Sequence, residues 1–454
     1  MTPPPGRAPV DPAALLRTRS YVQLLLLAAI IGVPVACVAY GFLWLVSELQ
    51  DALFTDLPDQ LGYATAPDWW PIPVLAVGGL LTAAAIQRLP GTGGHHPAEG
   101  FKAGGALPPV ELPGVMLAAF ATLSFGAVLG PEAPLIAIGS GLGVLAVRLA
   151  ARDAPPMAAT VIAAAGSFAA ISTLLGSPLL GAFLLLEASG LGGPMLGVVL
   201  VPGLLAAGVG TLIFVGLDSI TGLGTFSLAI PNVPPFDRPT IAMFGWAIVI
   251  GLVAPPLGVG IRRFAQFLRP VVERRMLLLL PLVGIGVGAL AAFFAAVTDH
   301  PASDVLFSGQ DQLPSLIAQA SEWSVGALLL LVACKGLAYG LSLSAFRGGP
   351  VFPAMFIGAA GGIAASHLPG LSLVPAVAMG IGAMSTVMLS LPLTSTLLAT
   401  LLLAADGLAV VPLVIVAVVV AYVVAAHLTP APPADPVEPA APTEGADARP
   451  RAAV

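Results

Sequence analysis

The sequence predicts an all-α polytopic membrane protein in which two inverted-topology repeats carry broken half-helices that meet at a central anion site. Of 454 residues, 57% are hydrophobic and 9% are charged, and the mean hydropathy is +0.99, which excludes an ordinary soluble domain. Unbroken apolar runs such as 21–46 and 276–297 favour helices over the alternating strands of a barrel. The third observation is a motif, G-P-x-x-P-x-x-x-I-G, which occurs at 130–139 and again at 349–358.

Both copies of the motif are typical of the start of a half-helix. Each begins with Gly-Pro and has a second proline that suits the first helical turn, where a missing N–H costs nothing. A helix N-terminus carries about half a positive charge and several unpaired N–H groups, so two such ends at membrane depth form an anion site without a lysine or arginine. The matched residues are Gly130, Pro131, Pro134, Ile138 and Gly139 in the first copy and Gly349, Pro350, Pro353, Ile357 and Gly358 in the second.

The apolar segments divide into two repeats with polar ends. A shared Ser-Thr start and a central proline, in 172–187 and 385–403, support this division. A basic N-terminal segment and an acidic loop after the first span place the N-terminus in the cytoplasm, and we expect both termini on the cytoplasmic side of the plasma membrane. The predicted parts are a cytoplasmic N-terminal segment at 1–20, a first transmembrane repeat at 21–217, a connecting segment at 218–240, a second transmembrane repeat at 241–427 and a disordered cytoplasmic tail at 428–454.

Several function classes have no support in the sequence. It has neither a basic patch for nucleic acid nor a Walker-type phosphate-binding loop, so we expect no nucleic-acid partner, no cofactor and no enzyme activity. Cys37 and Cys334 both lie in apolar segments, which favours small hydrophobic side chains over a disulfide. The expected partners are the lipid bilayer, a small anion and protons.

Glu132 is the main candidate for a functional side chain. A carboxylate at membrane depth costs about 2.5–3.5 kcal/mol on insertion scales, and a helix N-terminus returns about 0.3–1 and at most about 2 kcal/mol. Such a group is easily protonated, so it can fill an anion site as a tethered anion and leave that site when it is protonated or displaced. The alternative is an interfacial glutamate that only stabilises the first helical turn.

The chain resembles the CLC family of chloride channels and chloride/proton antiporters over nearly all of residues 20–427. Residues 130–134 resemble the family's G-K/R-E-G-P, 348–353 resemble G-G-x-F-x-P, 91–100 resemble the G-S-G-I-P region, and 177–187 resemble N-x-P-L-x-G with its following glutamate pair. The resemblance implies a CLC-like fold, a homodimer, chloride or a similar small anion as the substrate, and Glu132 as the gating residue. It also implies anion contacts at Thr92, Gly93, Gly94, Glu132, Ala133, Val351 and Phe352.

The chain also departs from the pattern of that family. Ala188 stands where the antiporters have their inner proton-transfer glutamate, and Glu187 matches the first member of the pair. The tyrosine that closes the inner side of the family's anion site has no clean match, because Tyr422 lies inside an apolar run. Pro131 and Pro350 replace two amide donors, each of which is worth about 1.5–3 kcal/mol to a bound charge. We therefore expect a low-affinity anion pathway that is uncoupled or atypically coupled to protons.

His95 and His96 lie in a glycine-rich loop and have three open interpretations. They are anion donors or candidate members of a proton path together with Glu187, they bind a metal with Glu99, or they only pack beneath a helix start. Lys335 and Asp406 lie in or near apolar runs, where a charge is functional, snorkels to the interface or forms a structural pair.

Three other functions remain open at this stage. The first is an antiporter that exchanges chloride, fluoride or nitrate for protons through a non-standard proton route. The second is a nonconducting relative with a structural or sensory role. The third is a metal-dependent intramembrane enzyme that uses His95, His96 and Glu99.

Overall fold

The computed structural model describes residues 16–103, 105–150, 155–190, 195–221, 236, 238–403 and 407–429. Within these ranges the chain is helical, and nine helices are long and apolar enough to cross a membrane. The predicted all-α class is confirmed. Most of the N-terminal segment, most of the connecting segment, nearly all of the tail and Asp406 lie outside the described residues.

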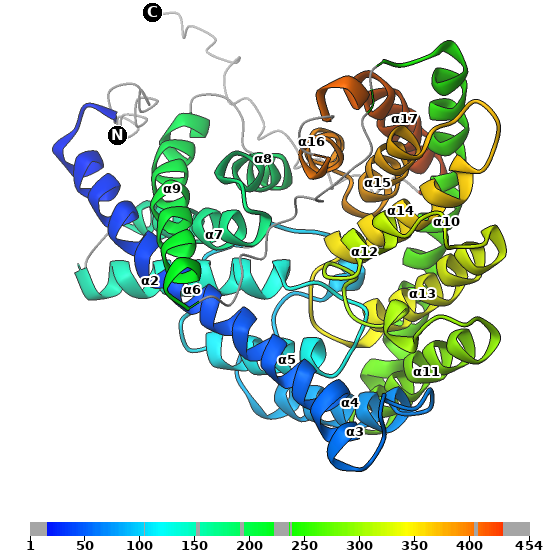
Figure 1. Ribbon diagram of the computed structural model, residues 1–454. Helices are drawn as coiled ribbons and strands as arrows, with labels where there is room; N and C mark the ends of the chain where they lie inside the picture. The colour runs from blue at the N-terminus through cyan, green and yellow to red at the C-terminus, as the bar shows by residue number, and fades with distance from the viewer. Residues whose placement is uncertain are drawn as a thin grey trace, which may run out of the picture.

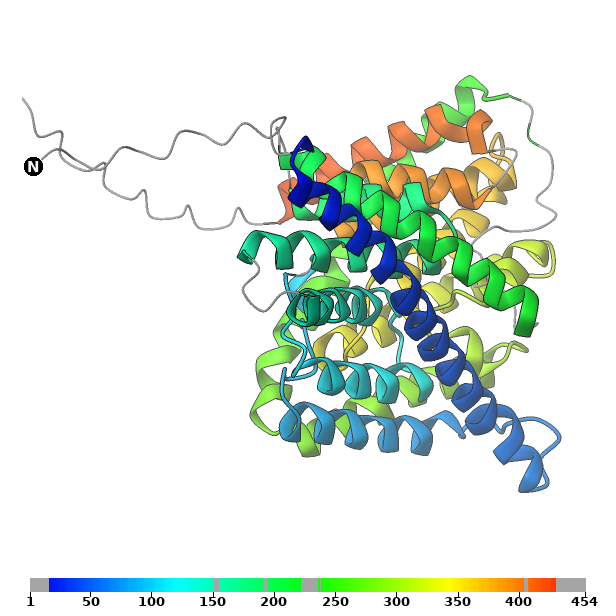
Figure 2. The ribbon, with the colours of Figure 1, turned by 90° about the vertical axis from the view of Figure 1, so that its left-hand side faces the viewer.

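The first repeat contains α2 to α9, with one long oblique helix and several shorter ones. Figure 2 shows α2 running obliquely across the face of this repeat. The elements are α2 (Arg19–Asp51), the π-helix η1 (Ala52–Asp56), α3 (Leu57–Gln60), α4 (Pro71–Arg88), the 3₁₀ helix η2 (Pro97–Glu99), α5 (Leu112–Ser124), α6 (Glu132–Ala150), α7 (Pro156–Leu175), α8 (Pro178–Ser189) and α9 (Met195–Thr221).

The second repeat contains α10 to α17 and lies largely on the opposite side of the molecule in Figure 1. The segment between α11 and α13 holds two short helices. The elements are α10 (Ile241–Arg274), α11 (Met276–Val297), the 3₁₀ helix η3 (Ala302–Asp304), α12 (Leu313–Ala318), α13 (Val325–Ala345), α14 (Val351–Ser366), α15 (Leu373–Leu389), α16 (Pro392–Leu402) and α17 (Gly407–Leu428).

The two repeats pack in the same way around their matched glycines. In the first, α6 packs on α7, and a Cβ at Gly139 would collide with the carbonyl of Gly166. In the second, α14 packs on α15, and a Cβ at Gly358 would collide with the carbonyl of Gly380. The last glycine of the duplicated motif is therefore the point where two helix backbones touch, as small residues allow in membrane helix pairs.

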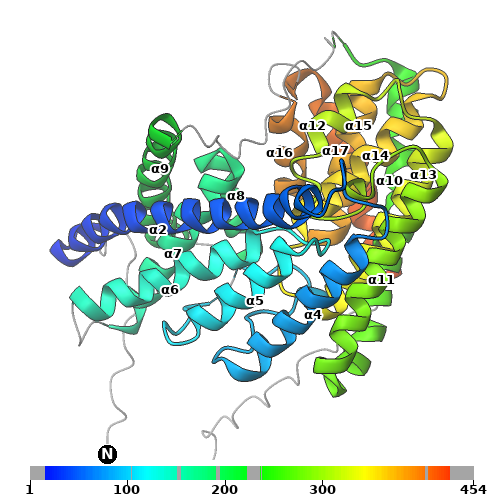
Figure 3. The ribbon, with the colours of Figure 1, turned by 60° about the horizontal axis from the view of Figure 1, so that its bottom comes forward.

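Helix α4 joins the two repeats by packing on α11, as Figure 3 shows. A Cβ at Gly284 of α11 would collide with the carbonyl of Leu75 on α4. The helices α5, α8 and α16 have 13, 12 and 11 residues, which is too short to cross a bilayer that needs about 20. They do not span a bilayer by themselves, and the end of α5 and the start of α6 each contribute residues to a cavity of the site.

Candidate functional site

The two copies of the duplicated motif meet backbone to backbone. The Gly130 N–H donates to the Gly349 carbonyl at 2.8 Å, and the Gly349 N–H donates to the Gly130 carbonyl at 2.6 Å. These are the first glycines of the two copies. The helices α6 and α14 begin within two residues of this bridge, so their N-termini face one shared point.

Two buried hydroxyls also connect the two repeats close to the bridge, one from each repeat. The amide of Val128 donates to Ser342 Oγ of α13 at 3.0 Å. The amide of Arg347 donates to Thr122 Oγ1 of α5 at 3.2 Å. Val128 and Arg347 each lie two residues before the bridging glycine of their own repeat. Each repeat therefore supplies a hydroxyl that holds the breaker segment of the other.

The Glu132 side chain is fully buried, with 0% of its surface exposed. Its Oε1 accepts a hydrogen bond from the Phe352 amide at 2.9 Å, and its Oε2 has no hydrogen-bond partner among the described residues. A Cβ at Gly130 or at Gly349 would collide with the carboxylate, so both glycines are needed to make room for it. The carboxylate of the first repeat thus lies at the N-terminus of α14, where a helix favours an anion.

A buried tyrosine holds the start of α14. The Tyr339 hydroxyl donates to the carbonyl of Pro350 at 2.7 Å, and Tyr339 is fully buried on α13. Pro350 is the residue before α14, so the bond fixes the peptide that precedes the Val351 and Phe352 amides. The Phe352 amide then points at Glu132, while Pro350 itself has no N–H to give.

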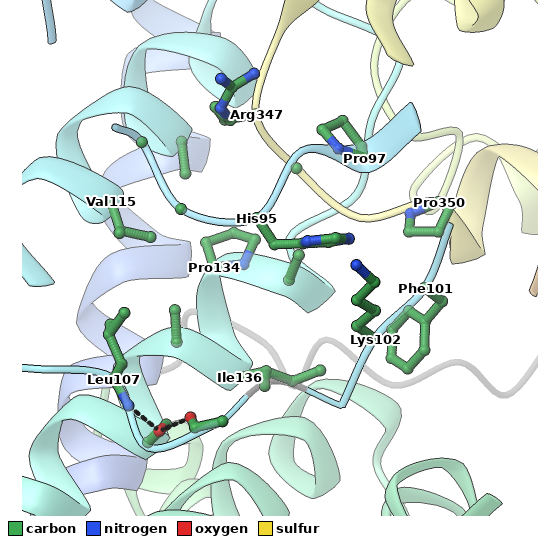
Figure 4. Close-up of a pocket in the computed structure, with 18 of the residues that line it drawn as sticks. His95, Pro97, Phe101, Lys102, Leu107, Val115, Pro134, Ile136, Arg347 and Pro350 are labelled. Carbon is green, nitrogen blue, oxygen red and sulfur yellow. Dashed lines mark hydrogen bonds between the residues drawn. The ribbon is translucent and has the colours of Figure 1, made fainter. Parts of the chain in front are cut away.

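One cavity of about 170 Å³, here the Lys102 cavity, is lined by Ala133 and Pro134 in the first turn of α6. Figure 4 shows its wall, in which Leu107 N–H donates to Ser140 Oγ at 3.0 Å and Ser140 donates to the Gly105 carbonyl at 2.7 Å. The cavity is lined by Gly93, Gly94, His95, Pro97, Gly100, Phe101, Lys102, Gly105, Leu107, Val115, Ala119, Ala133, Pro134, Ile136, Ala137, Ser140, Arg347, Gly348 and Pro350. Its charged lining residues are basic, and it reaches the residue after Glu132.

A second cavity of about 50 Å³, here the Asp311 cavity, is lined by a different set of residues. It includes Leu129 and Pro131, so it reaches the residue before Glu132. Its charged lining residue is acidic. The lining consists of Leu43, Val46, Ser47, Gln50, Leu123, Leu129, Pro131, Ser308, Gln310 and Asp311. The two chain neighbours of Glu132 therefore line different cavities, Ala133 one with basic side chains and Pro131 one with an acidic side chain.

The glycine-rich loop at 91–94 folds tightly beside the Lys102 cavity. Gly91, Gly93 and Gly94 have positive φ angles of 87°, 74° and 84°, and Thr92 has a φ of 49°. The Thr92 side chain is exposed, and its carbonyl accepts a bond from Arg347 Nε at 3.4 Å. Gly93 and Gly94 line the cavity, whereas Thr92 is not among its lining residues. The Thr92 contact to an anion stays a prediction.

His95 and Glu99 belong to an ion-pair network that ties this loop to α10. Glu99 pairs with Lys102 at 2.8 Å and with Arg269 at 2.9 Å, and His95 Nδ1 lies 3.5 Å from Glu99. The hydrogen bond from Lys102 lowers the pKa of Glu99 to about 2, so Glu99 is ionised at neutral pH. Burial lowers the pKa of His96 to about 3, so its ring is neutral there.

The histidines do not form a metal centre in this arrangement. No group of three His, Cys, Asp or Glu residues in the described part of the chain is placed to hold a metal ion. Glu99 is engaged by two cations instead, and His96 Nδ1 accepts the Ala98 amide at 3.3 Å. The described residues therefore give no support to a metal-dependent enzyme at His95, His96 and Glu99.

Glu187 caps a helix of the other repeat. Its carboxylate accepts the amides of Leu393 and Thr394 at 2.9 and 2.7 Å and the Thr394 hydroxyl at 2.6 Å. These groups belong to the first turn of α16. The side chain therefore satisfies N–H groups that a helix start leaves open. Its role in a proton path stays a prediction.

Lys335 is fully buried and is held by backbone carbonyls. Its Nζ donates to the carbonyls of Asp304, Val305 and Leu306 at 2.9, 3.2 and 2.8 Å, and lies 4.3 Å from the centre of the Phe356 ring. Of the alternatives that the sequence left open, a structural role fits best. Its partners are the carbonyls of the last residue of η3 and of the next two residues, and Asp406, the other candidate, lies outside the described residues.

Sequence reasoning missed several residues that build this site. Arg347 directly precedes Gly348 of the duplicated region, which was the available signal. Tyr339, Thr122 and Ser342 carry no local signal, because a hydroxyl inside an apolar helix has many roles. Asp311 lies in the segment between α11 and α13, and nothing in the sequence shows that this segment reaches Pro131.

Comparisons with known proteins agree with this architecture. The chain is 30% identical over 367 residues, which is 78% of this chain and 81% of the relative, to proteins provisionally named ion-transport protein YfeO from Escherichia coli O7:K1 (strain IAI39 / ExPEC) and Escherichia coli (strain SMS-3-5 / SECEC). The crystal structure of a slow cyanobacterial Cl⁻/H⁺ antiporter matches with a TM-score of 0.72 at 19% identity, covering 89% of this chain and 95% of that one.

The crystal structure of a CLC-type fluoride/proton antiporter matches with a TM-score of 0.67 at 21% identity, again over 89% of this chain and 95% of that one. At these identities the two structures show the fold. The family model described as voltage gated chloride channel matches residues 75–426. A bundle of broken helices around a shared anion-favouring point is thus the fold of a known family of membrane transporters, and the chain belongs to the voltage gated chloride channel (CLC) family.

Proposed function

We propose that this protein moves chloride or a similar small anion across the plasma membrane, through a pathway that Glu132 gates. The position of the Glu132 carboxylate carries the proposal. It lies at the N-terminus of α14, bound to the Phe352 amide, and the two chain neighbours of Glu132 line the Lys102 cavity and the Asp311 cavity. An anion that passes from one cavity to the other competes with the carboxylate for this position. Glu132 opens the pathway when its carboxylate is protonated or displaced and leaves the Phe352 amide.

The pathway has a direction in this proposal. The Lys102 cavity faces the cytoplasm, because the basic loop and the basic end of α10 lie beside it, and the Asp311 cavity faces outside. Both termini lie in the cytoplasm. Anions collect in the basic cavity, and their further contacts are the backbone of Gly93, Gly94 and Ala133 together with the amides of Val351 and Phe352.

Transport is uncoupled from protons or coupled in an atypical way. Ala188 stands where the family's antiporters have a second glutamate, and Glu187 is engaged in capping α16. Three donors of the first turn of α16 hold the Glu187 carboxylate, which favours a structural role. The main alternative is an antiporter, since both structural neighbours named above are proton antiporters, one for chloride and one for fluoride. Glu187, His95 and His96 are then the candidates for its proton path.

The working unit is a homodimer in which each subunit holds its own pathway. The support is the match to the CLC fold together with exposed apolar side chains on α9 and α17, such as Leu212, Val215 and Val419. A nonconducting relative is the remaining alternative. It is supported by Pro131 and Pro350, which have no backbone N–H to donate to an anion.

Chloride efflux from vesicles that contain the pure protein tests this proposal. Valinomycin and potassium set the voltage, and chloride and external pH are recorded together for the wild type and Glu132→Gln. We expect chloride efflux without stoichiometric proton movement, and a changed efflux in the variant. Protons that move against chloride would establish the antiporter alternative, and no flux of chloride, fluoride or nitrate would establish the nonconducting one.

A further inference from the structure

The Asp311 cavity has one charged lining residue, whose carboxylate belongs to a repeat different from that of Glu132. Asp311 comes from the second repeat, whereas Leu129 and Pro131 come from the segment that ends at Glu132. The other polar lining residues, Ser47, Gln50, Ser308 and Gln310, are neutral. An acidic side chain is a poor choice for binding an anion, so its presence beside a proposed anion pathway needs another explanation.

The segment that carries Asp311 is fixed to the same helix that binds Glu132. Lys335 holds the carbonyls at 304–306 and lies over the Phe356 ring, and a Cβ at Gly309 would strike that ring. Phe356 is one helical turn after Phe352, whose amide binds Glu132. The Phe307 amide also donates to the Gly126 carbonyl at 3.2 Å, close to the start of the first breaker segment. Asp311 is therefore built into the frame of the site.

Partial loss of solvent and a nearby negative charge both favour the neutral form of Asp311. The pKa of Asp311 is raised from its ordinary value, first because the cavity walls remove part of its solvent and second because Asp51 lies nearby. Asp51 ends α2, and Glu132 begins α6 directly after Pro131, which lines the cavity. No basic side chain lines the cavity among the described residues. Asp311 is also exposed at the outer side, so protons reach it from solution.

We propose that Asp311 is a proton-transfer residue that passes protons between the outer solution and Glu132. The inference rests on the proposed gating role of Glu132. In the inward step an Asp311 carboxyl oxygen takes a proton from hydronium or a protonated buffer. It then gives that proton through cavity water to Glu132 and returns to its ionised form. The protonated Glu132 gives up its bond with the Phe352 amide, and the anion position opens.

A pH-jump experiment measures this transfer as a rate. Protein in vesicles is exposed to a rapid external change from neutral to acid, and the rise in chloride efflux is followed with time. Asp311→Asn is expected to slow that rise by about a hundredfold, the low end for loss of a positioned proton-transfer group. Asp311→Glu keeps a carboxyl group and is expected to retain most of the rate.

The matched control is Asp51→Asn, which removes the same charge from a neighbouring residue that does not line the cavity. We expect its rate to stay within about twofold of the wild type, with a remaining effect that salt screens. A wild-type rate in Asp311→Asn, or equal slowing in both aspartate variants that disappears at high salt, would overturn the inference.

Glu132→Gln separates this inference from the function on which it rests. If the pH jump still raises efflux in Glu132→Gln, the gating proposal itself fails. If Glu132→Gln abolishes the response while Asp311→Asn keeps the wild-type rate, gating stands and only the proton transfer through Asp311 is wrong.

Discussion

The breaker segments of the two repeats share one backbone arrangement and differ in their side chains. Gly130 and Gly349 exchange a pair of hydrogen bonds, and each segment is held by a hydroxyl of the other repeat. At the position where the first repeat has Glu132, the second has Val351, and where the second has Arg347, the first has Val128. The shared backbone makes an anion-favouring point, and the unequal side chains place a carboxylate on one breaker segment and a guanidinium on the other.

The same comparison extends to the helices behind the breakers. Seven residues before Ser342 lies Lys335, whereas seven residues before Thr122 lies Val115. Lys335 fixes the segment at 304–306, and Val115 lines the Lys102 cavity. A buried cation in one repeat and an apolar side chain in the other show that the pseudo-symmetry is kept where the backbones meet and lost where the cavities differ.

The largest effect is expected from Gly130→Ala. The added Cβ would overlap the Glu132 carboxyl group, whose atoms are its three nearest neighbours, so the carboxylate must leave its place. We expect chloride efflux to change by about tenfold or more, which corresponds to about 1.4 kcal/mol. In a Glu132→Ala background the same substitution has room and should change efflux little.

Gly361→Ala is the matched control for that experiment, because a Cβ there meets nothing within 4 Å. Equal effects of Gly130→Ala in the presence and absence of the Glu132 carboxylate would show that Gly130 is needed for its hydrogen bonds with Gly349 and not to make room for the carboxylate.

Lys335→Met is expected to give the next largest effect. Three buried carbonyls lose their donor, and each unsatisfied buried group costs about 1–3 kcal/mol, partly offset because a buried charge is also removed. We expect a net loss of about 2–4 kcal/mol, measured as a lower midpoint of thermal denaturation in detergent. An unchanged midpoint would mean that Lys335 is not needed to hold the segment at 304–306.

Ser342→Ala tests the reciprocal hydroxyls. It leaves the Val128 amide without its acceptor, at a cost of about 1–2 kcal/mol in stability. The control is Ser344→Ala on the same helix, since Ser344 donates only to its own helix at Leu341. Thr122→Val should resemble Ser342→Ala in thermal denaturation, and a difference as large as the effect itself would count against the reciprocity of the two repeats.

Glu99→Gln should have the smallest effect. The pKa of Glu99 falls from 4.5 to about 2 because of its bond with Lys102, so its stabilising contribution is present above about pH 4.5 and is lost as the pH falls through about 2. The pair is partly exposed, which limits the contribution to about 1 kcal/mol or less. Denaturation midpoints of wild type and variant are expected to differ slightly at neutral pH and to converge in acid, and a gap that widens in acid would contradict this assignment.

Much of the fold could be predicted because local chemistry and the membrane determine it. Apolar composition dictates helices, and the duplicated motif marks both half-helix starts, with α6 beginning at Glu132 and α14 at Val351. The two short helices at 302–304 and 313–318 escaped prediction, because packing against Lys335 and Phe356 shapes that segment.

The site was predictable only in part. Glu132 stands out as an acidic residue in an apolar segment, but the amide that binds it comes from a residue 220 positions away in the chain. Tyr339 and Asp311 reach the site through tertiary packing that no spacing in the sequence records. Glu187 was a candidate for proton transfer, and its three donors on α16 became visible only when the two repeats were placed together.

The most direct test of the gating account is to ask whether an anion takes the place of the Glu132 carboxylate. Crystals of Glu132→Ala and of the wild type, soaked in bromide, would be compared by anomalous diffraction. We predict a bromide peak within hydrogen-bond distance of the Phe352 nitrogen in Glu132→Ala and its absence in the wild type, where the carboxylate accepts that bond. Bromide bound elsewhere in Glu132→Ala, with none at the Phe352 amide, would contradict the account.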